Sequence, residues 1–253
     1  MATYDSYVIC TSPRSGSTLL CKLLARTGVA GNPASYFHRP SVSAWCDALG
    51  LTQDDTMLER DILDVVFRVV IAEGSLETSI FGLRLQRHSF DFFAEKLALL
   101  HAGCTSDVQR FHAAFGRTLF IHLTRRDKVE QAVSYVKAAQ TGLWHMAPDG
   151  TELERLAPPG KPAYEADQIQ ARFDEVTDYD RDWESWFEAE EIEPLRITYE
   201  MLCRNPIETL RIVLGHLGLD RGAACGVKPE VAKLADDTSR DWAVRFRSKL
   251  GVA

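Results

Sequence analysis

The sequence lacks the cysteine and histidine spacings that hold zinc. Its six cysteines form no Cys-x-x-Cys pair, and none lies near a histidine at a zinc-ligand spacing. Cys10 and Cys21 stand among apolar residues and are expected to be buried thiols. The pattern therefore predicts no metal centre and fits a reducing compartment.

Segments that direct a chain to a membrane are also missing from this sequence. The N-terminus has no basic region followed by an apolar stretch, which a signal peptide needs. The longest apolar run, residues 65–72, is interrupted by Arg68 and is too short to cross a bilayer. We therefore expect a cytoplasmic protein without membrane insertion.

Positive charge is scarce. The 253 residues carry 29 Lys and Arg against 36 Asp and Glu, a net charge of −7. This balance argues against a nucleic-acid partner or an anionic membrane surface, but arginines concentrated locally still allow a small anionic ligand. Hydrophobic content of 45% and charged content of 26% are ordinary for a globular protein. We expect one domain over residues 1–253.

What the sequence does contain is a phosphate-binding pattern near its N-terminus. An apolar run at residues 7–10 precedes the segment Thr11-Ser-Pro-Arg-Ser-Gly-Ser-Thr18, and leucines at helical spacing follow it. Small residues let the backbone approach an anion, and the first N–H groups of a helix have no intrahelical partner. Arg14 adds a full charge. The residues predicted to bind an anion here are Pro13, Arg14, Ser15, Gly16, Ser17 and Thr18.

The same segment does not match a Walker A loop. That loop requires G-x-x-x-x-G-K-[ST], whose lysine reaches the terminal phosphates of a nucleotide. Here Ser17 stands where the lysine belongs, and the cation comes earlier, as Arg14. A P-loop phosphotransferase is therefore the weaker alternative. An ordinary helix N-terminus after a strand is the other reading that these residues alone leave open.

Strands and helices are expected to alternate along the chain. The predicted strands are 7–11, 80–85, 118–123 and 195–198, and the predicted helices are 17–26, 56–72, 89–100, 127–140, 165–190 and 206–217. Residues 142–162 are rich in Gly and Pro and are expected to form a long loop. This alternation predicts an α/β fold with a central parallel sheet flanked by helices.

A second group of polar residues follows the strand predicted at 118–123. Arg125 and Arg126 come at its end, and Ser134 lies two turns into the next helix. Open α/β sheets bind ligands at the carboxyl ends of their strands. One arginine and the serine are therefore spaced to contact one phosphate. The alternative is that both arginines pair with neighbouring carboxylates.

These two motifs and a late segment resemble the sulfotransferases that use 3′-phosphoadenosine 5′-phosphosulfate (PAPS). The late segment is Ile197-Thr-Tyr-Glu-Met-Leu202, followed by Asn205-Pro206 and Leu217-Gly-Leu219. The resemblance is to the bacterial trehalose 2-sulfotransferase group, with its lipopolysaccharide and Nod-factor sulfotransferase relatives. Other residues that carry it are 15–20, 27–31, Pro33, Phe37, 131–134, Gln140, Thr141, Trp144, Trp183, Trp186, Phe187, Asp241, Trp242, Arg245 and Arg247.

The resemblance implies a P-loop-like sulfotransferase fold and a reaction. A sulfonate group passes from PAPS to a hydroxyl of a carbohydrate or other small acceptor by in-line displacement. Arg14 and its loop are implied to hold the 5′-phosphosulfate, and Arg125 or Arg126 with Ser134 the 3′-phosphate. Tyr199 is implied to lie near the adenine.

Three further expectations come from the resemblance. Arg84 stands where the relatives carry a lysine, and it is expected to contact the sulfonyl oxygens or the acceptor. No metal is required. The chain is expected to form a homodimer, with the aromatic-rich helix 165–190 as a plausible part of the interface.

At one position the chain departs from the resemblance. The trehalose enzyme carries a glutamate as general base shortly after Gly31-x-Pro33, and Ser35 stands at that position here. A serine cannot hold the proton at neutral pH. His38 is the nearest titratable group and is predicted to be the base, with His145 as second candidate. The alternative is a degenerate chain that binds PAP or PAPS without turnover.

Overall fold

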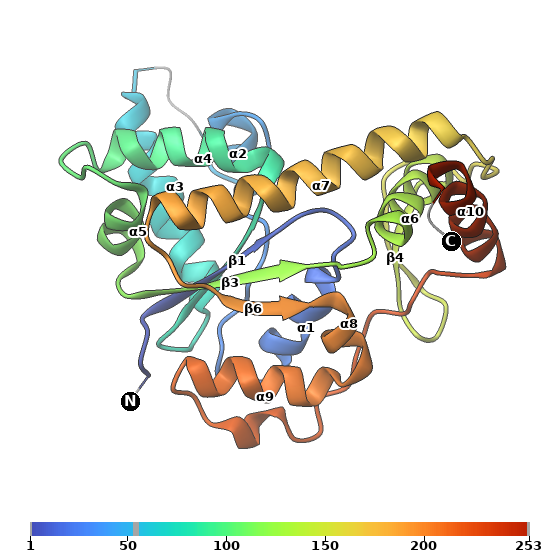
Figure 1. Cartoon of the computed structure of the whole chain (residues 1–253). Helices are drawn as coiled ribbons and strands as arrows, with labels where there is room; N and C mark the ends of the chain where they lie inside the picture. The colour runs from blue at the N-terminus through green and yellow to red at the C-terminus, as the bar shows by residue number, and fades with distance from the viewer. Residues whose placement is uncertain (1, 53–55, 252–253) are drawn as a thin grey trace.

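A four-stranded parallel sheet forms the centre of the protein (Figure 1). The computed structural model describes residues 2–52 and 56–251. The strands are β1 (Ser6–Thr11), β2 (Phe81–Gln86), β3 (Thr118–Thr124) and β6 (Leu195–Thr198), in the order β2-β1-β3-β6. Ser6 of β1 pairs with Phe81 on one side and with Thr118 on the other. The α/β fold predicted from the alternation of elements is confirmed.

The remaining elements surround this sheet. They are α1 (Ser17–Arg26), α2 (Val42–Ala48), α3 (Glu59–Ser75), α4 (Arg87–Leu100), α5 (Asp107–Phe115), α6 (Lys128–Thr141), β4 (Leu143–Met146), β5 (Glu152–Arg155), α7 (Ala166–Ala189), α8 (Tyr199–Arg204), α9 (Pro206–His216), the 3-10 helix η1 (Arg221–Ala224) and α10 (Asp237–Leu250). In Figure 1, α7 crosses above the sheet, α1 and α9 lie below it, and α6 and α10 lie beyond the end of the sheet at which the strands finish.

Both faces of the sheet are buried, because successive strand side chains point to opposite sides. Val8 and Cys10 of β1 pack with side chains of α3, α4, α5 and α7. Tyr7 and Ile9 pack with side chains of α1, α8 and α9. The three buried cysteines, Cys10, Cys21 and Cys46, are free thiols within these layers.

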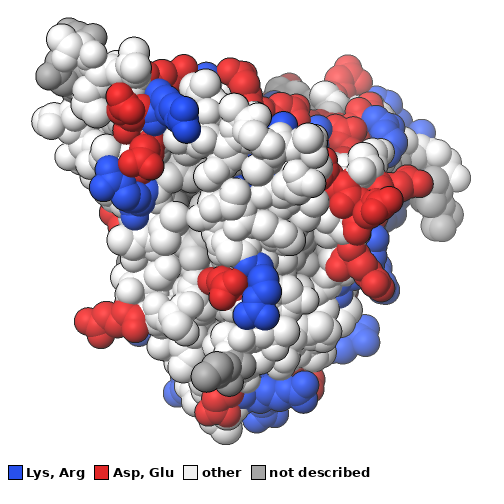
Figure 2. Space-filling view, turned by 90° about the vertical axis from the view of Figure 1, so that its left-hand side faces the viewer, with Lys and Arg blue, Asp and Glu red and all other residues white. Residues whose placement is uncertain are grey.

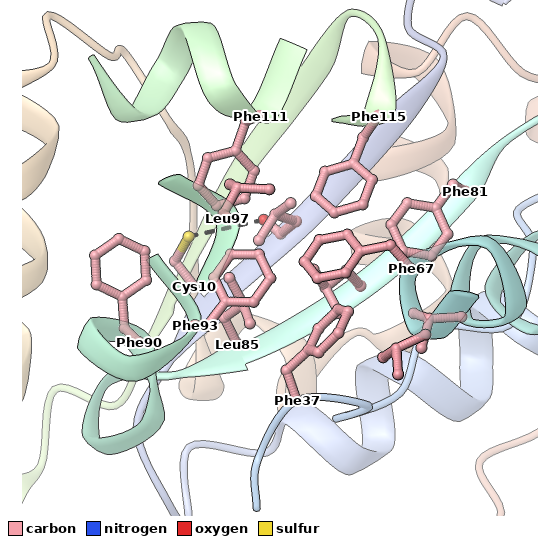
Figure 3. Close-up of a cluster of buried hydrophobic side chains, with 14 of the residues drawn as sticks. Cys10, Phe37, Phe67, Phe81, Leu85, Phe90, Phe93, Leu97, Phe111 and Phe115 are labelled. Carbon is pink, nitrogen blue, oxygen red and sulfur yellow. Dashed lines mark hydrogen bonds between the residues drawn. The ribbon is translucent and has the colours of Figure 1, made fainter. Parts of the chain in front are cut away.

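The larger core cluster is rich in aromatic rings (Figure 3). The ring of Phe37 lies 4.8 Å from that of Phe67 and 4.9 Å from that of Phe93, centroid to centroid. Phe37 thereby anchors the polar loop before α2 to the core. Trp183 and Phe187 of α7 belong to the same cluster, 0% and 2% exposed. These two rings are therefore buried in the core of the chain and are not available to a dimer interface.

The segment 142–162 is not the structureless loop that its composition predicted. Within it β4 and β5 pair as an antiparallel hairpin. Its turn contains Asp149, whose carboxylate accepts a hydrogen bond from the N–H of Thr151, and Gly150 at φ 89°. Asp and Gly are the residues that such a turn favours. The turn residues Asp149 and Gly150, which contributed to the prediction of a loop, thus form the turn of a hairpin.

The end of α3 also differs from the prediction. The helix runs to Ser75, beyond the predicted end at residue 72, and Gly74 lies within its last turn. A Cβ on Gly74 would lie 2.4 Å from Cε2 of Phe81, so this glycine allows helix and strand to approach closely. The sequence reasoning did not predict α2, α5, α8 or α10. In the part of the chain described, no helix has the length and apolar character needed to cross a membrane.

Candidate functional site

A cavity of about 1090 Å³ opens where the parallel strands end. Because all four strands run the same way, their carboxyl ends and the segments that follow them meet at one edge of the sheet. The hairpin and residues 229–240 complete the wall. The sequence-predicted residues that line it are Pro13, Arg14, Gly16, Ser17, Thr18, His38, Arg84, Arg125, Ser134, His145 and Tyr199. Ser15 and Arg126 do not line it.

The loop between β1 and α1 has a conformation suited to an anion. Arg14 has a φ of 64° and Gly16 a φ of 87°, both in the left-handed region. Ser15 is buried and fixes the turn through a 2.5 Å contact between its Oγ and Oγ1 of Thr11. Gly16 caps α1 without a side-chain hydrogen bond, so the first N–H groups of that helix have no side-chain cap.

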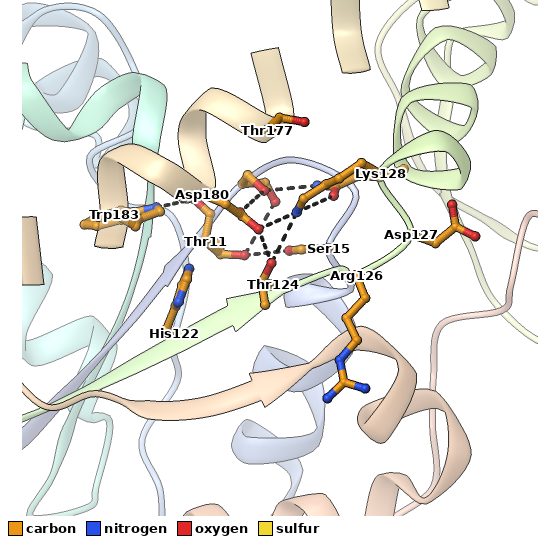
Figure 4. Close-up of polar contacts among 12 residues, drawn as sticks. Thr11, Ser15, His122, Thr124, Arg126, Asp127, Lys128, Thr177, Asp180 and Trp183 are labelled. Carbon is orange, nitrogen blue, oxygen red and sulfur yellow. Dashed lines mark hydrogen bonds and ion pairs between the residues drawn. The ribbon is translucent and has the colours of Figure 1, made fainter. Parts of the chain in front are cut away.

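A buried network behind the loop holds it to two helices (Figure 4). Asp180 of α7 pairs with Lys128 of α6 and accepts a hydrogen bond from Ser12 Oγ at 3.4 Å. Gln131 donates through Nε2 to Ser12 Oγ at 3.0 Å and to the carbonyl of Pro13 at 2.7 Å. The sequence reasoning missed Asp180, because nothing in the spacing of α7 links it to a loop 168 residues earlier.

Arg14 extends from the loop across the cavity. Its Nε donates to Ser134 Oγ at 3.0 Å, and its NH1 donates to the carbonyl of Trp144 at 2.6 Å. Burial, and then the nearby charge of Arg125, lower the pKa of Arg14 to about 10. The guanidinium stays protonated at neutral pH. Burial is the larger cause of the lowered pKa, and an anionic ligand would offset the second cause, the repulsion from Arg125.

Arg125 reaches the same cavity from the end of β3. It is 4% exposed, and its guanidinium pairs with Glu130 at 2.6 Å and lies 4.3 Å from the ring centroid of Tyr199. Its Nε is buried and has no hydrogen-bond partner among the described residues. Arg126 is exposed, and its side chain points away from the network (Figure 4), while its N–H donates to Glu200 at 3.1 Å.

Tyr199 closes one side of the loop. A Cβ on Gly16 would lie 2.7 Å from Cδ2 of this tyrosine, so the glycine lets the ring pack directly on the loop backbone. Burial raises the pKa of Tyr199 to about 12. The phenol therefore stays protonated at neutral pH and remains a hydrogen-bond donor.

Arg84 connects the opposite wall to α1. Its Nε donates to Ser35 Oγ at 2.7 Å, and its NH1 donates to Thr18 Oγ1 at 2.8 Å. Its backbone N–H donates to the carbonyl of Ala34 at 3.0 Å, which holds the loop before α2 against β2. Ser35 thus lines the cavity as a hydrogen-bond acceptor for an arginine.

Three histidines line the cavity, and two of them, His38 and His145, were named from the sequence. His38 is exposed, and its Nδ1 lies 2.6 Å from the carbonyl of Ser35. His145 projects from β4, and its Nδ1 contacts the carboxylate of Glu154 on β5. The sequence reasoning named both histidines but missed Glu154, because it predicted no hairpin.

The positive charge of the cavity is local. On the face shown in Figure 2, basic and acidic side chains are mixed among uncharged ones. In the cavity basic residues outnumber acidic ones, although the net charge of the protein is −7: the lining includes Arg14, Arg84, Arg125, Lys137, Arg155, Lys233 and Arg240, and the carboxylates of Glu130, Glu154 and Asp236. Among the residues described, no group of three or more His, Cys, Asp or Glu side chains has a metal-binding arrangement.

Comparison with known proteins finds a family and similar proteins over nearly the whole chain. The family described as Stf0 sulphotransferase matches residues 6–249. A trehalose 2-sulfotransferase of Mycolicibacterium smegmatis is 28% identical over 268 residues, which cover 96% of this chain and 94% of the relative. A trehalose 2-sulfotransferase of Mycobacterium tuberculosis is also 28% identical, over 263 residues with the same coverage. A crystal structure of a sulfotransferase from Alicyclobacillus acidocaldarius aligns with a TM-score of 0.45 at 12% identity, over 98% of this chain and 96% of that one. The family model matches nearly the whole chain, including the segments that line the cavity. The chain therefore belongs to the Stf0 sulphotransferase family.

Proposed function

We propose that this chain transfers the sulfonate group of PAPS to a hydroxyl of a carbohydrate acceptor. The observation that carries the proposal is the convergence of the loop after β1 and Arg125 on one cavity. PAPS has two anionic ends, the 5′-phosphosulfate and the 3′-phosphate, and the cavity offers a guanidinium for each. The two relatives named as trehalose 2-sulfotransferases support a sugar as the acceptor class.

The seat proposed for the 5′-phosphosulfate is the start of α1. The uncapped N–H groups after Gly16, the positive end of the helix and the Arg14 guanidinium all favour a negative group. An anion at this point would also offset the repulsion between Arg14 and Arg125, which contributes to the lowered pKa of Arg14. These features suit a phosphosulfate better than a neutral ligand.

The seat proposed for the 3′-phosphate combines Arg125 and Ser134. Arg125 keeps one buried N–H without a partner among the described residues, and guanidinium groups bind phosphate through several N–H donors at once. Ser134 Oγ now accepts from Arg14 at 3.0 Å, so the two seats are adjacent. Tyr199 lies between Gly16 and Arg125 and is proposed to contact the nucleoside.

Transfer needs charge stabilisation more than covalent catalysis. When bound, PAPS supplies the sulfonate and a phosphate leaving group. Arg14 is proposed to neutralise the charge that gathers on the departing phosphate, since fixed cations at developing charge lower the barrier most. Arg84, held through Thr18 beside the same helix start, is proposed to contact the sulfonyl oxygens or the acceptor.

The experiment that tests the proposal is incubation with ³⁵S-labelled PAPS and a panel of hydroxylated sugars that includes trehalose. The expected result is label on a sugar and release of PAP. Binding of PAP without transfer to any acceptor would support the alternative that Ser35 leaves open, a binding protein without turnover. Indifference to PAPS together with turnover of a nucleoside triphosphate would support a phosphotransferase instead.

The neighbouring arginines at the end of β3 give a matched pair of variants. Arg125→Ala is expected to erase the preference for PAP over AMP, because only PAP carries the 3′-phosphate. Charge-assisted contacts of this kind contribute about 10-fold or more to affinity. Arg126→Ala, at an exposed position outside the cavity, is expected to keep that preference. Calorimetry with both nucleotides measures it, and a preference that survives in Arg125→Ala places the 3′-phosphate elsewhere.

The chain is also proposed to form a homodimer, as its resemblance to the trehalose 2-sulfotransferase group implies. Trp183 and Phe187 are buried, so α7 can take part only through its other side chains. Multi-angle light scattering is expected to give twice the 28.4 kDa mass of one chain. The mass of a single chain across the working concentration range would refute this.

A further inference from the structure

The hairpin carries a histidine and a carboxylate that face each other beside the proposed donor seat. His145 of β4 and Glu154 of β5 both line the cavity, and Nδ1 of the histidine contacts the carboxylate. A carboxylate only accepts hydrogen bonds, so Nδ1 carries the hydrogen and Nε2 of the neutral ring has a free lone pair. This is the tautomer that a general base requires.

The pair is connected to the arginines of the site. The carbonyl of Trp144, the residue before His145, accepts the 2.6 Å hydrogen bond from Arg14. The pKa of Glu154 is lowered, first by the hydrogen bond from His145 and further by the charges of Arg84 and Arg14. The carboxylate therefore stays ionised at neutral pH. It is within electrostatic reach of Arg84 on β2 and of Arg14 on the loop after β1.

His38 has the weaker geometry of the two histidines. Its Nδ1 faces the carbonyl of Ser35, a neutral group, and its side chain is exposed at the rim. The side chain of His145 is 21% exposed, and its partner is a full negative charge. When the ring accepts a proton it becomes an imidazolium, and a charged carboxylate stabilises that cation more strongly than a neutral carbonyl does.

We propose that His145, oriented by Glu154, is the general base of the transfer. In this step Nε2 of His145 takes the hydroxyl proton of the acceptor. The acceptor oxygen forms a bond to sulfur, and the bond from sulfur to the 5′-phosphate oxygen breaks. Its electron pair leaves on that phosphate as PAP. Glu154 is a positioning residue, because it acts through the ring. This inference rests on the proposed function.

The test compares His145→Asn, Glu154→Gln and His38→Asn with the wild type in transfer from PAPS and in PAP affinity. His145→Asn is expected to lower kcat by on the order of 10²-fold and to leave PAP affinity within about twofold, since the ring takes part only in proton transfer. Glu154→Gln is expected to move the acid limb of the kcat/KM profile to lower pH, because the amide no longer favours the imidazolium. Glu152→Gln, on the same strand but outside the cavity and paired with Arg155, is the matched control.

The charged side chains that act on the Glu154 carboxylate are those of His145, Arg84 and Arg14. Arg155 and Glu130 also line the cavity, and its other histidines are His38 and His88. A kcat of His145→Asn equal to that of the wild type overturns the inference, as does an unmoved acid limb in Glu154→Gln. A loss confined to His38→Asn assigns the base to that residue instead. A wild type that binds PAP but transfers nothing overturns the proposed function itself, and is distinct from these outcomes.

Discussion

Replacing Arg14 with alanine is expected to lower kcat/KM for PAPS by on the order of 10³-fold, since the loss of one fixed donor at developing charge costs 10²–10³ on its own. The variant also removes a cation that the ground-state donor needs, so PAP affinity is expected to fall about 10-fold or more. The physical reason is the position of Arg14, a half-buried cation of the cavity lining that is held by Ser134 and the carbonyl of Trp144 beside the start of α1. Steady-state kinetics and calorimetry measure the two effects separately.

Two other variants sharpen this result. Arg14→Lys keeps the charge but cannot donate to Ser134 and Trp144 from one planar group, so its losses are expected to be intermediate. Arg26→Ala, on the last turn of the same helix, removes an arginine whose side chain is 64% exposed and paired with Glu230. It is expected to bind PAP like the wild type. Unchanged PAP binding in Arg14→Ala would contradict the assignment of this residue.

The parts of the site that follow strands directly could be predicted from sequence. A strand, a turn of small residues and a helix are consecutive, and the proposed phosphate seat depends on contacts within eight residues, from Thr11 to Thr18. The same holds for Arg125, which comes one residue after β3. Sequence alone left Arg125 and Arg126 as alternatives, because it does not show which side chain turns inward. The choice depends on Tyr199 and Glu130, whose side chains receive the guanidinium of Arg125.

The parts that depend on distant segments were missed. Asp180 supports the loop from 168 residues away, and neither its burial nor its partners follow from the periodicity of α7. Glu154 was missed for a different reason. Leu143 and Trp144 precede a turn with Asp149 and Gly150, and this pattern also suits a hairpin, but the surrounding prolines favoured a loop. The local composition therefore indicated the turn correctly, but it did not indicate the two strands, β4 and β5, on either side of the turn.

Replacing Gly16 with alanine is expected to lower PAP affinity by on the order of 10²-fold, through two effects that act together. The residue has a φ of 87°, which an L side chain adopts at a cost of about 1–3 kcal/mol. The new Cβ would also lie 2.7 Å from the ring of Tyr199, so the ring must move away from the loop. Both changes disturb the seat proposed for the 5′-phosphosulfate and the position of the ring beside Arg125. Calorimetric titration with PAP measures the outcome.

Gly28 provides the matched control at the other end of the same helix. It also has a positive φ, 69°, but in the described part of the chain no atom beyond its sequence neighbours lies within 4 Å of the position that a Cβ would take. Gly28→Ala is therefore expected to lower the free energy of unfolding by about 1 kcal/mol through the backbone alone and to bind PAP normally. If the two variants lose the same PAP affinity, the effect comes from the stability of α1 and not from the contact with Tyr199. A large loss in Gly16→Ala alone, with both proteins folded by circular dichroism, ties the donor seat to the close approach of glycine and tyrosine.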